Sequence, residues 1–214
     1  KAGDEMHGFR TVSVTPLESN LTVAVQFEHI KTGARALHLY CCDQENMFSV
    51  SFPTPPADDT GLPHIIEHSV LSGSKNYPVR DPFFEMLKMS PATFINAMTG
   101  SDKTMYPVCS NVRQDLFNLA EVYFDAVFRP LLTRDTFARE AHHLAPADAD
   151  EPTGELTIKG VVYSEMKAAF SQPEARLGRL CFRRLLPDTP YGYESGGDPE
   201  AIPELTYDQY MKFY

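Results

Sequence analysis

The most informative segment of the sequence is Gly61-Leu62-Pro63-His64-Ile65-Ile66-Glu67-His68-Ser69-Val70-Leu71. Pro63 suits the first turn of a helix, where the N–H group that proline lacks has no partner to lose. The pattern therefore predicts a short helix over residues 63–71. Residues three and four positions apart share one face of a helix. We expect His64, Glu67 and His68 to lie side by side on that face.

Two imidazoles at this spacing can bind one metal ion together. Catalytic zinc takes three protein ligands and keeps an open position for water, whose proton an adjacent carboxylate can accept. The pattern therefore indicates His64 and His68 as ligands and Glu67 as the general base. The competing interpretation is a solvated helix face that carries two histidines and a glutamate without a metal.

A third ligand is required, and two glutamates qualify. Glu140 and Glu165 follow His68 by 72 and 97 residues, each in a segment expected to be helical. Spacing alone leaves the choice between them open. His142 and His143 lie beside Glu140, but adjacent helical residues point about 100° apart and make poor joint ligands. We expect both of these histidines to be exposed on a helix.

On either side of residues 61–71, the sequence predicts mostly strands in the first part of the chain and mostly helices in the later part. This order of elements favours an α+β fold. Residues 21–29, 35–41 and 46–52 read as an antiparallel meander. Residues 93–99 and 104–110 read as two more strands joined by a turn, and residues 155–159 as another. The helices are expected over residues 81–89, 111–128, 133–144, 160–170 and 173–186.

The composition narrows the classes of function. The 214 residues carry a net charge of −10, which disfavours a nucleic-acid partner and suits a cationic one. No run of 18 apolar residues is present, so we expect no membrane span. The four cysteines show no C-x-x-C pair, which is typical of reduced thiols in a reducing compartment. Because the chain lacks an initiator Met, we expect it to be part of a longer polypeptide.

Three long stretches carry a resemblance to a known family. They are GLPHIIEHSVLSGSKNYPVRDPFFEMLKMSPATFINAMTGSDKTMYPV (61–108), GVVYSEMKAAF (160–170) and LLPDTPYGYESGGDPEAIPELT (185–206). They resemble the pitrilysin/insulinase family of zinc metallopeptidases, and more narrowly its presequence-protease branch. The H-x-x-E-H order of residues 64–68 is the known inverzincin signature. The resemblance implies an α+β fold in which a mainly antiparallel sheet packs against helices.

The resemblance also implies roles for individual residues. One Zn²⁺ per chain would be held by His64, His68 and Glu165, the last lying in SEMKA where the family often has NEMKG. Glu67 would activate the zinc-bound water. Glu140 resembles an acidic position near the metal and would orient a ligand.

Substrate binding is implied at two further places. FINAMT resembles the family's substrate-binding edge strand, where Asn96 would add a hydrogen bond and the small Ala97 would allow close approach of a peptide. Phe83 and Phe84 resemble residues that line the pocket beside the metal. An ordinary core role is the alternative for all four residues.

Together these inferences predict a zinc-dependent metalloendopeptidase domain that hydrolyses short or unfolded peptides, cationic ones among them. Residues 1–214 would form a single catalytic N-terminal domain, with the remaining domains of the same parent chain as partners. We expect the isolated chain to bind zinc without efficient turnover. The compartment would be a bacterial cytoplasm or an organellar matrix. The alternative function is a catalytically inert, zinc-bearing module that binds peptides or serves as a scaffold.

Overall fold

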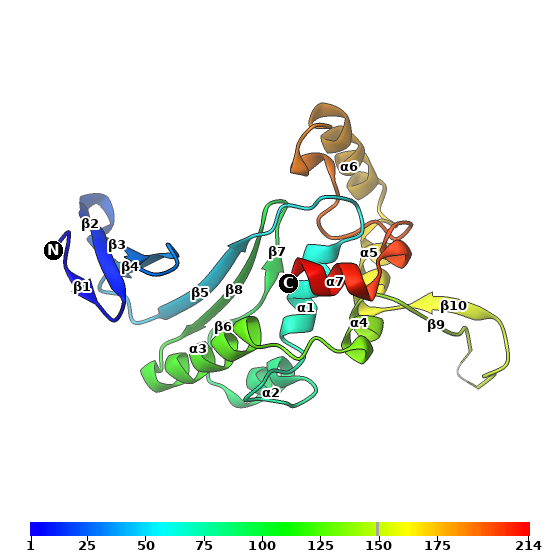
Figure 1. The fold of residues 1–214 in the computed structure, drawn as a ribbon, viewed down its shortest axis with the longest axis horizontal. Helices are drawn as coiled ribbons and strands as arrows, with labels where there is room; N and C mark the ends of the chain where they lie inside the picture. Colours follow the sequence, from blue (N-terminus) through cyan, green and yellow to red (C-terminus); the bar gives the residue numbers. More distant parts are fainter. Residues whose placement is uncertain (149) are drawn as a thin grey trace. The chain divides into compact units, whose positions relative to one another are not determined.

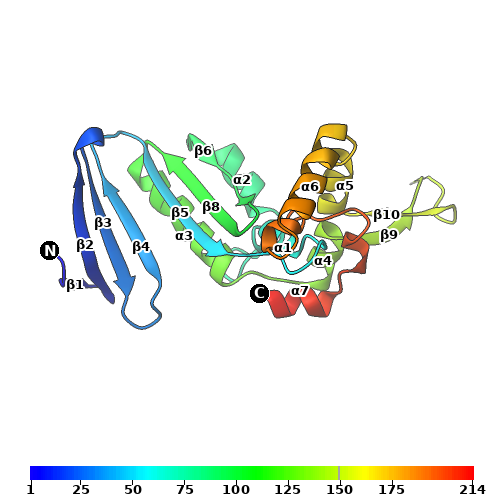
Figure 2. The ribbon, with the colours of Figure 1, turned by 90° about the horizontal axis from the view of Figure 1, so that it is seen from above.

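The computed structural model describes residues 1–148 and 150–214, which divide into two compact units. The first unit is Lys1–Glu45 and the second is Asn46–Tyr214. Every residue of interest for the metal hypothesis lies in the second unit. Figures 1 and 2 show the elements of both units.

The first unit is one antiparallel sheet with the strand order β1-β2-β3-β4. Short turns connect the successive strands. In the turn before β4, Gly33 adopts a positive φ of 72°. A β-bulge interrupts the pairing of β2 with β3 between Thr11 and Ser13. The strands are β1 (Glu5–Met6), β2 (Phe9–Leu17), β3 (Thr22–His29) and β4 (Arg35–Tyr40).

The three-strand meander predicted for residues 21–52 is only partly correct. β3 and β4 pair as expected, but β5 (Asn46–Pro53) leaves that sheet and pairs along its whole length with β8 (Lys103–Ser110). β8 begins about fifty residues after the end of β5, so the local sequence pattern of β5 cannot predict this pairing. β2 is a strand for which the sequence analysis assigned no element.

The second unit contains a second antiparallel sheet with the order β5-β8-β6, in which β7 also pairs with β8. The expected strand over 93–99 is divided into β6 (Phe94–Ile95) and β7 (Met98–Thr99). Between them, the side-chain oxygen of Asn96 accepts a hydrogen bond from the backbone N–H of Ala97 at 2.9 Å. This local bond competes with regular strand pairing, so the edge of the sheet is broken at these two residues.

Seven helices are described, and two of them organise the core. α3 lies along β5 and β8 (Figures 1 and 2), where Phe124 meets Phe48 and Phe128 meets Phe52. α1 contacts β7, α4 and α7 and buries Ile65 and Val70. The helices are α1 (Leu62–Val70), α2 (Pro82–Met89), α3 (Arg113–Phe128), α4 (Arg134–Glu140), α5 (Val161–Ala169), α6 (Pro173–Leu185) and α7 (Tyr207–Phe213).

The helix expected over 133–144 ends earlier than predicted. α4 stops at Glu140, and the chain then forms β9 (His143–Pro146), which pairs with β10 (Leu156–Lys159). His142 lies between the two elements and is partly buried, with Nε2 2.9 Å from the carbonyl of Leu205. The expectation of exposed helical histidines is therefore wrong for His142. His143 is exposed, but it lies on a strand.

The predicted α+β class, with a mainly antiparallel sheet packed against helices, is confirmed. The described helices include none with the length and apolar character needed to cross a bilayer. All four cysteines are free thiols.

Candidate metal centre

α1 presents its two histidines away from the core. Gly61 precedes the helix in a left-handed conformation, and Pro63 lies in the first turn as the sequence predicts. Ile65 and Val70 are buried, so the opposite side of the helix carries His64 and His68 toward a pocket. The two imidazole rings lie 4.8 Å apart and nearly perpendicular to each other.

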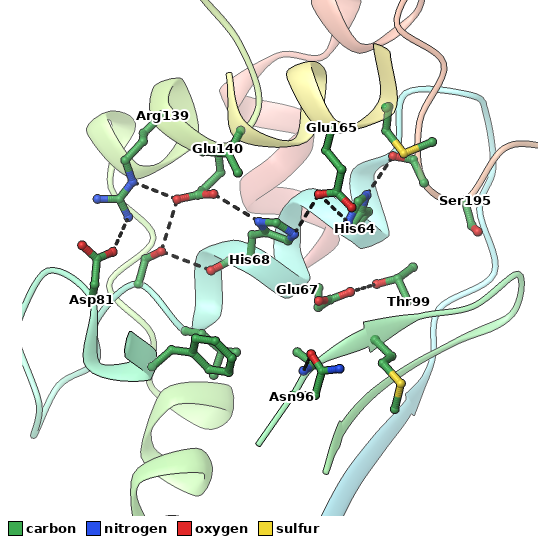
Figure 3. A pocket seen from close by; sticks show the side chains of 18 of the residues that line it. His64, Glu67, His68, Asp81, Asn96, Thr99, Arg139, Glu140, Glu165 and Ser195 are labelled. Carbon is green, nitrogen blue, oxygen red and sulfur yellow. Dashed lines mark hydrogen bonds and ion pairs between the residues drawn. The ribbon is translucent and has the colours of Figure 1, made fainter. Parts of the chain in front are cut away.

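A glutamate from α5 completes the cluster (Figure 3). Glu165 Oε2 lies 3.8 Å from His64 Nε2 and 3.8 Å from His68 Nε2. One ligand atom from each of these three residues falls within 4.8 Å of the others. Two helices far apart in sequence thus bring two imidazole nitrogens and one carboxylate together.

The spacing of these atoms fits a zinc ion. Tetrahedral bonds of about 2.0–2.1 Å place neighbouring ligand atoms about 3.4 Å apart. The two histidine–glutamate spacings of 3.8 Å exceed that value by a few tenths of an ångström, and the three ligand atoms together lie within 4.8 Å of one another. Two histidines and a glutamate are also a recurrent ligand set of catalytic zinc sites, in which the fourth position stays open.

Each imidazole is held at the nitrogen that does not face Glu165. His64 Nδ1 lies 3.0 Å from the carbonyl oxygen of Gly196, and His68 Nδ1 lies 3.3 Å from Glu140 Oε2. A carbonyl oxygen only accepts hydrogen bonds, so the proton of neutral His64 belongs on Nδ1. This arrangement leaves Nε2 with the lone pair that a metal requires.

The geometry separates the two candidate third ligands. Glu165 faces both Nε2 atoms, whereas Glu140 lies behind His68 at Nδ1. Glu140 is buried and is also bound by Arg139, whose Nε donates to Oε1 at 2.8 Å. The arrangement supports Glu165 as the ligand and Glu140 as the residue that orients His68.

Charges around His68 and Glu140 affect each other. Burial by itself raises the pKa of Glu140, but hydrogen bonds from His68 and Arg139 outweigh it and hold that pKa below its ordinary value. Burial lowers the pKa of His68, but the hydrogen bond to Glu140 and the charges of Glu67, Glu140 and Glu165 outweigh burial and raise it. His68 and Arg139 therefore keep Glu140 ionised and available to His68.

Glu67 lies beside the cluster without joining it. Its side chain is on the same face of α1 and is only 6% exposed. The hydroxyl of Thr99 on β7 donates a hydrogen bond to Glu67 Oε2 at 2.6 Å (Figure 3). This bond fixes the carboxylate and leaves Oε1 without a hydrogen bond from the described residues. The role of general base predicted for Glu67 stays a prediction that this geometry supports.

The cluster opens into a pocket of about 780 Å³. Phe83 and Phe84 of α2 line one part of it, with their rings perpendicular and 5.5 Å apart. Asn96 and Ala97 line it from the broken edge of the sheet. The structure therefore brings all the predicted site residues to one pocket, whereas the substrate-binding roles of these four stay a prediction.

The described lining of the pocket is strongly acidic. Besides His64 and His68, its only basic side chain among the described residues is that of Arg139, which lies between Glu140 and Asp81. The acidic side chains that line it are Glu67, Asp81, Glu140, Glu165 and Glu194. A bound divalent cation would offset part of this charge, and a cationic ligand would be attracted to the rest.

Sequence reasoning missed several contributors to this site. Thr99 donates a hydrogen bond to Glu67 and Arg139 donates one to Glu140, and no sequence motif predicts either bond. Gly196 acts through a backbone carbonyl, and the sequence analysis assigned its segment no role at the metal site. The Gly196-Gly197 pair was the available signal, because adjacent glycines often mark a close approach of backbone to its neighbours.

Comparisons with known proteins identify the family of the chain. Residues 55–172 match the model of the insulinase family, peptidase family M16. The chain is 47% identical over 214 residues to the mitochondrial presequence protease of Mus musculus, covering all of this chain and 21% of that protein. It is 44% identical over 212 residues to presequence protease 1, chloroplastic/mitochondrial, of Arabidopsis thaliana, covering 98% of this chain and 19% of that one.

A solved structure extends the comparison to the fold. The crystal structure of pitrilysin superposes with a TM-score of 0.70 at 21% identity, covering 96% of this chain and 21% of pitrilysin. At that identity the likeness concerns the fold. The chain spans about a fifth of the length of the curated relatives that it matches.

Proposed function

The chain belongs to the insulinase family of peptidases, family M16, and on that premise we propose that it is the catalytic N-terminal domain of a zinc-dependent metalloendopeptidase. One observation carries the proposal. His64, His68 and Glu165 direct one ligand atom each to a single point, and Glu67 lies beside them with a fixed carboxylate. The parent protein would hydrolyse short or unfolded peptides.

The residues divide the chemistry among them. Zinc at this point would supply a Lewis acid that lowers the pKa of water and polarises a carbonyl group. His64 and His68 would offer Nε2, because their Nδ1 atoms are held by Gly196 and Glu140. Glu67 would accept the proton of the attacking water at Oε1 and later deliver it to the leaving amine. Thr99 would keep that carboxylate aimed while the proton moves.

The edge of the sheet supports an extended peptide as the substrate. β6 and β7 pair with β8 on one side, and among the described strands none pairs with their other side. An extended chain can add to such an edge through backbone hydrogen bonds, largely without regard to sequence. Asn96 and Ala97 lie on this edge, and Phe83 and Phe84 would accept an apolar side chain in the same pocket.

Charge supports a preference for basic peptides. The pocket carries five carboxylates and one guanidinium among its described lining residues. One zinc ion would leave this region negative, so cationic peptides would be concentrated near it. We propose cationic peptides as the preferred substrates and the remaining domains of the parent chain as the partners that complete the binding site.

A second candidate function is a zinc-bearing module that binds peptides without cleaving them. The free sheet edge and the apolar wall would serve such a module equally well. The presence of Glu67 beside the three ligands favours catalysis, because a binding module has no need of a positioned base. On compartment, the mitochondrial and chloroplastic names of the two relatives fit an organellar matrix, and a bacterial cytoplasm stays the other expectation.

Hydrolysis of a fluorogenic basic peptide tests the proposal. The full-length parent should cleave it in a zinc-dependent manner, and Glu67→Gln should abolish cleavage while leaving zinc bound. The isolated 214-residue chain should bind zinc with little turnover. Wild-type parent that binds zinc and peptide but never cleaves would favour the binding module instead.

A further inference from the structure

Three glycines bring the loop of residues 194–198 against the start of α1. A Cβ on Gly61 would lie 2.6 Å from the Cα of Gly197 and 2.7 Å from the carbonyl oxygen of Gly196. Gly61 and Gly197 also have φ values of 69° and 101°, which other residues rarely adopt. Backbone therefore packs directly on backbone, and this contact lets the Gly196 carbonyl reach His64 Nδ1.

Asp59 fastens both ends of the same loop. Its backbone carbonyl accepts a hydrogen bond from the N–H of Asp198 at 2.8 Å. Its side-chain Oδ1 accepts one from the N–H of Glu194, also at 2.8 Å. Asp59 lies two residues before Gly61, so these hydrogen bonds attach the loop to the segment that leads into α1.

Arg179 of α6 bridges the two aspartates. Its guanidinium lies 2.5 Å from Asp198 Oδ2 and 3.5 Å from Asp59 Oδ1, and it stacks 5.2 Å from the ring centre of Phe170. The arginine and both carboxylates are less than a fifth exposed, so solvent screens these pairs less than it screens surface pairs. Arg183 also reaches Asp59, at 3.3 Å, but its side chain is half exposed.

We propose that Arg179 is a positioning residue for His64. By bridging Asp59 and Asp198 it would hold the loop so that the Gly196 carbonyl accepts a hydrogen bond from Nδ1–H of His64 and Nε2 faces Glu165. The inference rests on the proposed zinc function for its consequence, since a misaligned His64 would bind zinc less well. Loss of an outer partner of a metal-binding histidine typically weakens metal binding about 10–100-fold.

The test compares two disruptive variants with a matched control. Arg179→Met removes the whole bridge, and Asp198→Asn removes the charge of one of its two aspartates. Arg176→Met is the control, because Arg176 lies on the same helix and the structure gives its side chain no ion pair among the described residues. All proteins are studied as the full 214-residue chain, with folding checked by circular dichroism.

Two readouts are made on each protein. Nitrogen-15 NMR of the zinc-free chain at pH 8.5 reports which ring nitrogen of His64 and of His68 carries the proton. Competition with a chromophoric chelator then gives the zinc dissociation constant. We expect His64 to lose its preference for Nδ1–H in both disruptive variants, His68 to be unchanged, and zinc to bind about tenfold more weakly. The control should match the wild type in both readouts.

The outcomes keep the two proposals apart. Unchanged His64 signals and unchanged zinc affinity in folded Arg179→Met and Asp198→Asn would overturn the positioning role and leave the zinc function standing. Wild-type chain that takes up no zinc, yet shows a His64 tautomer dependent on Arg179, would refute the zinc function and support the positioning role. Unfolding of both variants would overturn the positioning role by assigning the bridge to stability alone.

Discussion

Asp125 of α3 ties the loop that follows α1 to the rest of the core. Its side chain is 1% exposed, and Oδ2 accepts hydrogen bonds from the hydroxyl of Ser74 at 2.6 Å and from the N–H of Asn76 at 2.8 Å. The guanidinium of Arg129 lies 2.5 Å from Oδ1. The substitution Asp125→Ala would leave the buried hydroxyl of Ser74 and the N–H of Asn76 without this acceptor and would remove the ion pair.

The magnitude follows from these contacts. Each of the two hydrogen bonds to this charged acceptor contributes about 1.5–3 kcal/mol to stability, whereas the pair with the half-exposed Arg129 adds at most about 1 kcal/mol. We expect Asp125→Ala to lower the free energy of unfolding by about 3–5 kcal/mol and Tm by roughly 10 °C. Urea unfolding followed by circular dichroism measures the loss. Asp115→Ala is the control, because Asp115 on the same helix is less buried and accepts from Ser90 alone, so about 1 kcal/mol is expected.

The loss should depend on pH. Burial alone raises the pKa of Asp125, but the hydrogen bonds from Ser74 and Asn76 and the charge of Arg129 outweigh burial and lower it below its ordinary value of 3.8. A carboxylate with a lowered pKa in the folded state stabilises the protein above the unfolded-state pKa, and this contribution disappears as pH falls through the folded-state pKa. The difference in unfolding free energy between wild type and Asp125→Ala should therefore be constant near neutral pH and narrow below about pH 4. A loss under 1 kcal/mol at pH 7, or a difference that stays constant down to the acid transition, would refute this account of the loop.

Glu67→Gln should keep about one zinc per chain while lowering peptide hydrolysis by the parent protein at least about 100-fold; simultaneous loss of zinc would make Glu67 a structural residue instead. Glu140→Gln should weaken zinc binding about 10–100-fold without abolishing it, as measured by chelator competition. An unchanged affinity would show that Glu140 does not orient His68 for metal binding. Basic peptides should show a higher kcat/KM than acidic peptides of matched length, with a gap that closes as salt rises. Equal rates at low salt would contradict the steering argument.

The elements that depend on local pattern could be predicted from the sequence. Pro63 and the spacing of His64, Glu67 and His68 are enough to define α1 and its metal-facing side, and the helical period fixes α3 within two residues. Elements that depend on distant partners could not. β5 joined β8 instead of β4, and the helix expected to reach residue 144 ended at Glu140 because the following residues pair with β10.

The candidate site shows the same division. Sequence spacing could not choose between Glu140 and Glu165, because both follow His68 on later helices. The choice depends on which imidazole nitrogen each carboxylate faces, and only the packing of α4 and α5 around α1 decides that. The role of the Gly196 carbonyl could not be predicted for another reason. Every residue has a backbone carbonyl, so residue identity indicates such an acceptor only through the glycines that permit close approach.

Metal content of the purified chain, measured by plasma mass spectrometry after reconstitution at neutral pH, tests the central claim most directly. The wild type and Glu140→Gln are compared with His68→Ala and Glu165→Ala at zinc concentrations that saturate the first two. We predict about one zinc per chain in the wild type and in Glu140→Gln, and loss of that zinc in His68→Ala and Glu165→Ala. Wild-type chain without zinc, or Glu165→Ala that retains it while Glu140→Gln does not, would contradict the account.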